Sequence, residues 1–227
     1  MVLALVRIVL LVGIKVVSRC LWAFTVEWVG RRPAHPFRDA RIGLLLNHTS
    51  LYEPLFLGVL PIGWLWQLSV RGLLPGADST LDRPIVGRVF KWMTPYTISI
   101  SRARDATWRH FMSLVSLGTV VLMAPEGRMK RADGLDKHGR KMTVRGGIAD
   151  ILDRMEDGTI AILYSGGLHH VQTPGDPFPR VFRRVFCRIE EMPIARYKKE
   201  MGHGTPEFRA NVMADLDRRR DRHSRWD

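Results

Sequence analysis

Short apolar runs alternate with segments whose apolar residues recur at helical spacing, from residue 41 to about residue 164. The predicted strands are residues 42–46, 64–71, 97–101, 119–123 and 159–164, and the predicted helices are residues 54–60, 84–92, 105–117 and 146–156. This alternation predicts an α/β fold with a mixed, mostly parallel central sheet flanked by helices. Residues 42–46 are apolar on both faces, so we expect them to form a central, parallel strand.

Three further segments interrupt or follow this pattern. Residues 130–145 form a polar, basic, glycine-containing loop that is long enough to suggest function rather than connection. Residues 181–189 interleave arginines with apolar residues, which indicates a half-exposed or edge strand. Residues 205–220 predict a C-terminal helix with a charged end.

The first 22 residues predict an amphipathic helix. At 100° per residue, Arg7, Lys15 and Arg19 share one side, and leucine, valine and isoleucine fill most of the rest. The longest uncharged run, residues 8–14, is far shorter than the roughly 18 residues that a membrane-spanning helix needs. A broad apolar face beside a cationic stripe is typical of a helix that lies in the plane of a membrane. The alternative is a helix packed on the protein's own core.

We therefore divide the chain into a membrane-associating segment, residues 1–30, and an α/β domain, residues 31–227. This division predicts a peripheral or monotopic protein on the cytoplasmic face of a membrane. The apolar stretch is not followed by the small residues of a signal-peptide cleavage site. The two cysteines, Cys20 and Cys187, lack CxxC or metal-ligand spacing, so we expect reduced thiols and no bound metal.

Polar residues follow four of the predicted strands. Residues 47–48 are Asn-His, Arg102 follows residues 97–101, residues 125–128 read Pro-Glu-Gly-Arg, and residues 165–168 read Ser-Gly-Gly-Leu. Ligands in open α/β sheets bind beyond the carboxyl ends of the strands. The sequence therefore predicts a site where these strand ends converge.

His48 and Glu53 are candidates for a general base and the carboxylate that orients it. On one helix they would lie about 140° apart, so they can pair only if His48 precedes the helix and Glu53 lies in its first turn. Pro54 favours that arrangement, because proline is tolerated only at the start of a helix. Two structural alternatives stay open: Glu53 completes a capping box with Ser50, and His48 is a structural histidine.

The net charge of +13 predicts anionic partners, which include phospholipid headgroups, phosphorylated metabolites and nucleic acid. Of 35 basic residues 28 are arginine, whose planar fork suits phosphate and carboxylate, although a GC-rich genome would give the same excess. The sequence contains no recognisable nucleic-acid-binding motif or aromatic stacking stripe. We therefore expect no specific nucleic-acid partner.

Residues 47–53, Asn-His-Thr-Ser-Leu-Tyr-Glu, resemble the NHxSxxD block of the glycerolphosphate acyltransferase family, especially its lysophosphatidic-acid acyltransferases. Three further pieces follow in the family's order: Arg71, residues 98–102 ending in Arg102, and residues 125–128, which resemble the family's PEG block. The resemblance covers roughly residues 40–190. The sequence departs from the family where Glu replaces the Asp of the first block, and where Arg128 and Met129 replace the Thr and Arg of the PEG block.

The resemblance implies that residues 31–227 transfer a fatty acyl group from acyl-CoA or acyl-carrier protein to the hydroxyl of a lysophosphatidic-acid-like or other lysolipid acceptor. The donor is a co-substrate, and no cofactor is implied. His48 would be the general base and Glu53 would orient it. The remaining implied residues are the phosphate ligands Arg102, Arg128, Lys130 and Arg71, and the loop-shaping residues Glu126 and Gly127. Two alternatives are an acceptor that is an amino-acid-derived lipid or a glycolipid, and a lipid-binding protein that has lost catalysis.

Overall fold

The computed structural model describes residues 1–84, 86–101, 103–116, 118–173, 176 and 178–224. Within these residues the strands form one seven-stranded sheet in the order β1-β7-β6-β2-β5-β3-β4. The strands are β1 (Ala23–Trp28), β2 (Ala40–Leu46), β3 (Gly72–Ala77), β4 (Tyr96–Ile100), β5 (Val120–Met123), β6 (Thr159–Ser165) and β7 (Arg184–Pro193). Neighbouring strands are parallel except for the antiparallel pair β6–β7. The predicted mixed, mostly parallel sheet is confirmed, with β2 at its centre.

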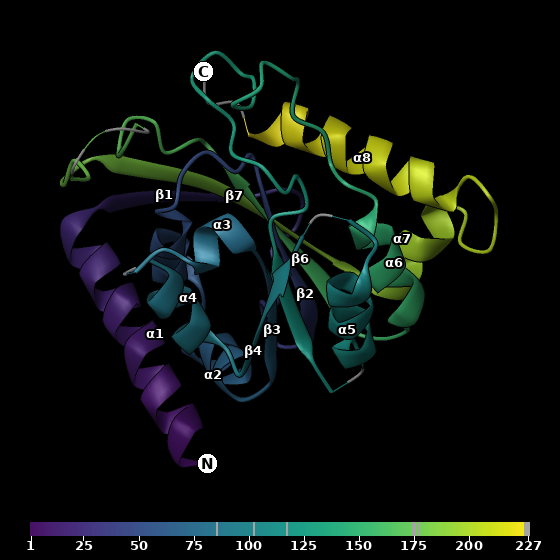
Figure 1. Cartoon of the computed structure of the whole chain (residues 1–227), viewed down its shortest axis with the longest axis horizontal. Helices are drawn as coiled ribbons and strands as arrows, with labels where there is room; N and C mark the ends of the chain where they lie inside the picture. Colours follow the sequence, from purple (N-terminus) through teal and green to yellow (C-terminus); the bar gives the residue numbers. More distant parts are fainter. Residues whose placement is uncertain (85, 102, 117, 174–175, 177, 225–227) are drawn as a thin grey trace.

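Helices cover both faces of the sheet (Figure 1). One layer, here called the α1–α4 layer, contains α1 (Val2–Leu21), the 3₁₀ helix η1 (Glu53–Val59), α2 (Ile62–Arg71), α3 (Asp78–Leu81) and α4 (Val86–Met93). The other, the α5–α8 layer, contains α5 (Ala106–Leu114), α6 (Gly147–Arg154), α7 (Ile194–Glu200) and α8 (Phe208–His223). Each layer has its own apolar core, because side chains alternate between the faces along a strand. In β6, for example, Ile160 and Ile162 pack under the α5–α8 layer, whereas Ala161 and Leu163 pack under the α1–α4 layer.

One sequence-based assignment was wrong. Residues 64–71, predicted as a strand, belong to α2, and the strand begins one residue after that helix ends. Trp64, Leu65 and Leu68 recur at helical spacing and are buried against the sheet, which is the pattern of a helix. For residues 181–189 the half-exposed alternative holds: β7 alternates buried and more exposed positions, and it is not an edge strand, because β1 pairs in parallel with its residues Arg184–Ile189.

The N-terminal helix is confirmed as a helix, and it packs on the domain. The Lys15 ammonium donates hydrogen bonds of 2.8 Å to the carbonyls of Gly58 and Leu60, at the end of η1. Leu11 is buried, whereas Val2, Leu3, Leu5, Val6, Val9, Val16 and Val17 are exposed. Among the described residues, no helix combines the length and apolarity needed to cross a bilayer. The division at residue 30 stays a prediction.

Candidate active site

The site begins where β2 ends, at a turn made by Asn47. Asn47 has a φ of 65°, a left-handed conformation that asparagine tolerates better than most residues. Its side-chain amide is buried and donates a 2.9 Å hydrogen bond to the Ser165 carbonyl at the end of β6. The turn therefore takes the chain out of the sheet and is fixed to the neighbouring strand, with His48 as the next residue.

His48 lies beside Glu53, the first residue of η1. His48 Nδ1 is 3.0 Å from Glu53 Oε1, and the histidine side chain is 21% exposed while the carboxylate is buried. The same Oε1 accepts 2.8 Å hydrogen bonds from the backbone N–H groups of Thr49 and Ser50. Pro54 is the next residue of η1, where its missing N–H costs no intrahelical bond. The histidine thus precedes the helix, and the carboxylate lies in its first turn.

Glu53 performs part of the predicted capping role as well. Its bond to the Ser50 N–H is one half of a capping box, but the Ser50 hydroxyl accepts from the Tyr52 N–H rather than from the Glu53 N–H. Glu53 Oε2 is buried and has no hydrogen-bond partner among the described residues. The carboxylate is therefore oriented by the backbone and has one oxygen that structural contacts do not use.

The pKa of His48 is raised above its ordinary value. Burial alone would lower the pKa, but the charge of Glu53, whose carboxylate lies 3.0 Å away, and the charge of Glu126 together outweigh burial. The pairing favours the imidazolium form, which a general base needs once it has accepted a proton. Because Nδ1 faces Glu53, Nε2 is the ring nitrogen left for a substrate.

Glu126 holds the backbone on the other side of His48. This buried carboxylate accepts the N–H of Asn47 on Oε1 at 3.2 Å and the N–H of His48 on Oε2 at 2.8 Å. Oε1 also accepts from Arg220, a residue of α8, at 3.2 Å. The pKa of Glu126 is raised, because burial outweighs the two N–H donors and the charges of Arg220 and His48, which lower it. Both oxygens accept hydrogen bonds, which is the bonding pattern of an ionised carboxylate.

The loop after β5 contacts His48 as well. Gly127 has a φ of 64°, which glycine adopts without strain, and it turns the chain after Glu126. Three residues further on, the Lys130 N–H donates a 2.7 Å hydrogen bond to the His48 carbonyl, and its ammonium lies 3.3 Å from Asn47 Oδ1. The backbone of His48 is therefore held at its N–H by Glu126 and at its carbonyl by Lys130.

Arg128 lines the same cavity as His48 but is already paired. Its guanidinium makes an ion pair with Asp136, a buried residue of the loop after β5. The Arg140 backbone N–H, together with that of His138 and the Arg128 guanidinium, lowers the pKa of Asp136 to about 2. Among the described residues, Arg128 Nε is buried without a hydrogen-bond partner. The Nε–H of Arg128 is therefore left for a ligand.

Of the predicted phosphate ligands, Arg71 lies away from His48 and Arg102 lies outside the described residues. Arg71 is the last residue of α2 and directly precedes β3. Because β3, β5 and β2 run parallel, Arg71 lies at the amino-terminal end of the strands, whereas His48 follows the carboxyl-terminal end of β2. Its guanidinium donates to Gln67, and burial together with the charge of Arg41 lowers its pKa. The prediction for Arg71 came from the family resemblance, which expects a basic residue after the second strand, but residues 64–71 are helical here.

His48 and Glu53 open onto a cavity of about 440 Å³ between the sheet and the α1–α4 layer. Its lining includes the apolar residues Phe56, Leu57, Leu60, Trp64, Phe90 and Leu163. It also includes the cationic residues Arg83, Arg128, Lys130, Arg131 and Lys137. The cavity lining combines apolar side chains, the histidine–carboxylate pair and cationic side chains, which suits an amphiphilic ligand with an anionic group.

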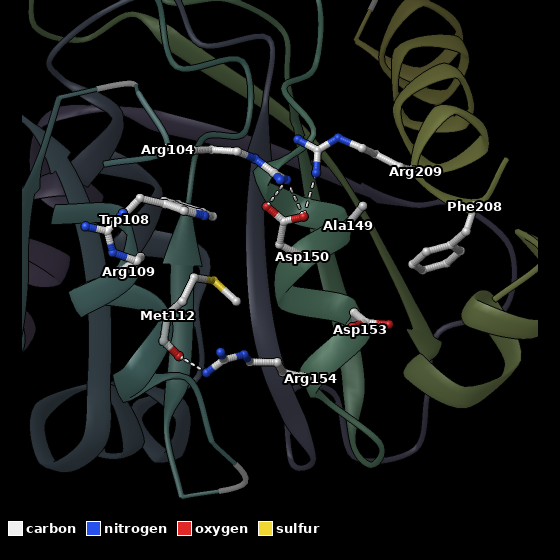
Figure 2. Close-up of a pocket in the computed structure, with 10 residues that line it drawn as sticks. All are labelled: Arg104, Trp108, Arg109, Met112, Ala149, Asp150, Asp153, Arg154, Phe208 and Arg209. Carbon is white, nitrogen blue, oxygen red and sulfur yellow. Dashed lines mark hydrogen bonds and ion pairs between the residues drawn. The ribbon is translucent and has the colours of Figure 1, made fainter. Parts of the chain in front are cut away.

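A second cavity, of about 530 Å³, lies between α5, α6 and α8 (Figure 2). Asp150 lies between Arg104 and Arg209 there and accepts hydrogen bonds from both. Arg154 donates to the Met112 carbonyl. None of the described site residues predicted from the sequence lines this cavity. Its arginines are partly occupied by contacts between the helices, so its chemistry is that of a helix interface.

Sequence reasoning missed three residues that shape the site. Asn47 was noted at the strand end, but its left-handed turn was not foreseen, and an asparagine directly after an apolar strand is the signal that could have shown it. Asp136 and Arg220 contact site residues only through the folded chain, and Arg220 is 94 residues from Glu126. No local pattern marks either residue.

The fold and the site define a class: an α/β protein whose histidine–carboxylate pair lies at the carboxyl end of the central strand and lines a largely apolar cavity. The structure is similar to that of the 1-acyl-sn-glycerophosphate (LPA) acyltransferase PlsC from Thermotoga maritima, with a TM-score of 0.59 and 18% sequence identity. The similarity covers 96% of this chain and 81% of that one. No family model matches the sequence, and no curated protein does. This chain therefore shares the fold of an LPA acyltransferase.

Proposed function

We propose that this protein is an O-acyltransferase that moves a fatty acyl group from acyl-CoA or acyl-carrier protein to the hydroxyl of a lysophosphatidic-acid-like or other lysolipid acceptor. The observation that carries the proposal is the 3.0 Å pair of His48 and Glu53 at an apolar cavity, in a fold shared with an LPA acyltransferase. Neither the fold nor the pair is sufficient evidence alone, because one fold hosts many functions and a histidine–carboxylate pair supports many reactions.

In the proposed reaction, His48 Nε2 takes the proton of the acceptor hydroxyl while the hydroxyl oxygen attacks the thioester carbonyl. The tetrahedral intermediate then collapses, the carbon–sulfur bond breaks, and the imidazolium returns the proton to the leaving thiolate. Glu53 stabilises the imidazolium between these steps. The acyl group passes directly from sulfur to oxygen, without an acyl-enzyme.

The apolar part of the cavity is the proposed site of the acyl chain. Each methylene that leaves water there stabilises the complex by roughly 0.8 kcal/mol. The walls come from η1, α2, α4 and β6; η1 contains Glu53, and β6 pairs with β2, the strand that precedes His48. A chain in this cavity would therefore bring its thioester end to His48.

The cationic part of the lining is the proposed site of the acceptor's phosphate. Lys130 and Arg128 are its main candidates, and Arg102 is a further candidate from the family resemblance. Glu126 and Gly127 shape this region through the turn after β5. The ion pair of Arg128 with Asp136 reduces the positive charge available to a phosphate. This pairing favours a second candidate acceptor of lower charge, such as an amino-acid-derived lipid or a glycolipid.

A membrane phospholipid surface is the proposed partner of the α1–α4 layer. The exposed apolar residues of α1 lie in the same layer as Ile62, Trp66 and Val70 of α2 and Trp92 of α4, all of which are exposed. Helix α1 contacts both α2 and α4. An apolar surface of this kind suits a peripheral protein on the cytoplasmic face, and it lies on the cavity's side of the sheet.

The test is acyl transfer by the purified full chain with acyl-CoA and acyl-carrier donors and a panel of lysolipid, amino-acid-derived and glycolipid acceptors. We expect turnover with at least one acceptor, and its loss in His48→Ala with liposome binding retained. Mass spectrometry of co-purified lipid would report chain and headgroup together. Unchanged turnover in His48→Ala would contradict the mechanism. Lipid binding without turnover by the wild type would instead indicate a lipid-binding protein that has lost catalysis.

A further inference from the structure

Arg220 is a buried arginine of α8 that has no place in the proposed chemistry. Its side chain is 4% exposed, and it does not line the cavity that contains His48. Buried arginines are costly unless their charge is paired. Arg220 is paired with Asp217 at 2.6 Å, with Asp221 at 2.9 Å and with Glu126 at 3.2 Å. The first two partners are neighbours on the same helix, whereas Glu126 lies beside the site.

Glu126 connects Arg220 to the turn formed by Asn47 and His48, here called the catalytic turn. Its two oxygens receive the consecutive N–H groups of Asn47 and His48, so one carboxylate fixes two peptide units. Asn47 has a left-handed φ, a conformation that persists only where the surroundings hold it. Without its counter-ion, Glu126 would be an unpaired charge in a buried position and would favour its neutral form. A neutral carboxyl carries a proton on one of its oxygens, and each oxygen of Glu126 now accepts an N–H.

The remaining contacts of Arg220 support the same arrangement. Asp217, its second partner, also accepts a 3.0 Å hydrogen bond from the Val144 N–H. The next residue, Arg145, donates its N–H to the Pro125 carbonyl, one residue before Glu126. Arg220 is thus connected to the segment around Glu126 both directly and through the end of the loop that follows β5.

We infer that Arg220 is a positioning residue for the proposed acyl transfer: it keeps Glu126 ionised and in place, and Glu126 holds the turn that presents His48. This inference rests on the proposed function for its kinetic consequences. Its structural part, the hold on the Asn47 and His48 amides, can be measured without any substrate. Arg220 touches neither substrate nor the His48 ring, so it acts through Glu126.

The chain offers a matched control in the adjacent residue of α8. Arg219 is also a partly buried arginine, and it pairs with Asp215 of α8 and Glu190 of β7. Arg219→Met therefore removes a comparable anchor between α8 and the sheet, but not the contact with Glu126. Any effect that comes only from loosening α8 should appear in Arg219→Met as strongly as in Arg220→Met.

The first measurement is amide hydrogen exchange of the full chain, followed by NMR. In Arg220→Met we expect the Asn47 and His48 amides to exchange at least tenfold faster, while Ile42 and Leu44 of β2 stay as in the wild type. Arg219→Met should leave the two turn amides unchanged. Equal acceleration in both variants would overturn the inference. If Arg220→Met does not fold, Arg220→Lys replaces it, because lysine keeps the positive charge but lacks the planar guanidinium. Arg220→Lys should accelerate exchange at the Asn47 and His48 amides by a smaller factor. Unchanged exchange at both amides in Arg220→Lys would overturn the inference.

The second measurement is a kinetic double-mutant cycle. We expect Arg220→Met to lower kcat 10- to 100-fold with little change in KM for donor or acceptor, and Arg220→Lys to recover part of the loss. In a Glu126→Gln background, Arg220→Met should cost nothing further, because the residue it acts through is already changed. The same loss in both backgrounds would overturn the inference. Should the wild type transfer no acyl group, the proposed function fails, and the exchange data still decide the role of Arg220.

Discussion

The two helical layers that cover the sheet differ in chemistry. The α1–α4 layer exposes valines, leucines and tryptophans and encloses the apolar cavity beside His48. The α5–α8 layer is held by ion pairs, among them those of Arg209, Arg219 and Arg220. In the proposed function the α1–α4 layer contacts lipid, and the α5–α8 layer holds the turn at Asn47 and His48 from the opposite face of the sheet. The comparison suggests that contacts with substrate and rigidity of the site are supplied from opposite faces of the sheet.

The largest expected effect comes from removing His48, the proposed general base. His48→Ala is expected to lower kcat about 10³-fold, because a positioned general base contributes roughly 10²–10⁴-fold. The side chain is partly exposed and lies outside both apolar cores, so the melting temperature should change little. Steady-state acyl transfer and thermal unfolding measure the two effects. A loss of activity that accompanies unfolding would not support a catalytic role.

The next effect concerns the carboxylate that faces the ring. Glu53→Gln is expected to lower kcat roughly 10²-fold, because the imidazolium loses its counter-charge. Since Glu53 helps to raise the pKa of His48, that pKa should fall in the variant. The base works when unprotonated, so the acidic limb of kcat/KM against pH should move to lower pH. An acidic limb that stays in place would show that Glu53 does not control the protonation of His48.

The local part of the site was predictable, because its geometry depends on neighbours in sequence. A strand end, a histidine, a glutamate five residues later and Pro54 together restrict the turn to one workable arrangement. The central position of β2 likewise followed from an apolar run with two buried faces. The packing of the two helical layers and the order of the strands then decide which other residues surround His48 and Glu53.

The non-local part was not predictable. The contact between Glu126 and Arg220 depends on how α8 returns to the sheet, and no spacing in the sequence encodes it. The error at residues 64–71 had a different cause: exposed Trp66 and Val70 made a helix look like an alternating strand. Because residue 71 ends this helix and precedes β3, Arg71 does not follow a second strand as the family resemblance implied.

The difference between the layers in surface chemistry can be tested on vesicles. The double substitution Val6→Glu and Val9→Glu in α1 is expected to weaken binding to phospholipid vesicles roughly tenfold for each valine, from about 1.5 kcal/mol per buried apolar side chain. The matched control is Ala210→Glu, at an exposed apolar position of α8 in the other layer. Vesicle sedimentation measures both. Equal weakening by the control would mean that charge, rather than the α1 surface, governs binding.

A smaller effect is expected inside the cavity. A Cβ at Gly43 would lie 2.7 Å from the Trp64 ring and 3.1 Å from Leu122, and both side chains line the cavity. Gly43→Ala should push them inward, cost about 1–3 kcal/mol of stability and disfavour long-chain donors several-fold against short ones. Gly63→Ala in α2 is the control, because a Cβ there meets no described atom within 4 Å. Donor competition measures the preference, and an unchanged preference would exclude this wall as a constraint on the acyl chain.

The smallest effect is the pH dependence of stability that the pair contributes. The raised pKa of His48 means that the folded protein holds the proton more tightly than the unfolded chain does. This contribution is fully present below the unfolded-state value of about 6.5 and is lost as the pH rises through the raised folded-state pKa. The difference in free energy of unfolding between wild type and His48→Gln should therefore be larger at about pH 6 than at about pH 9. Urea unfolding measures it, and the dependence should shrink when both proteins carry Glu53→Gln. A dependence of opposite sign would mean that burial outweighs the two carboxylates, and that neither layer prepares His48 to accept a proton.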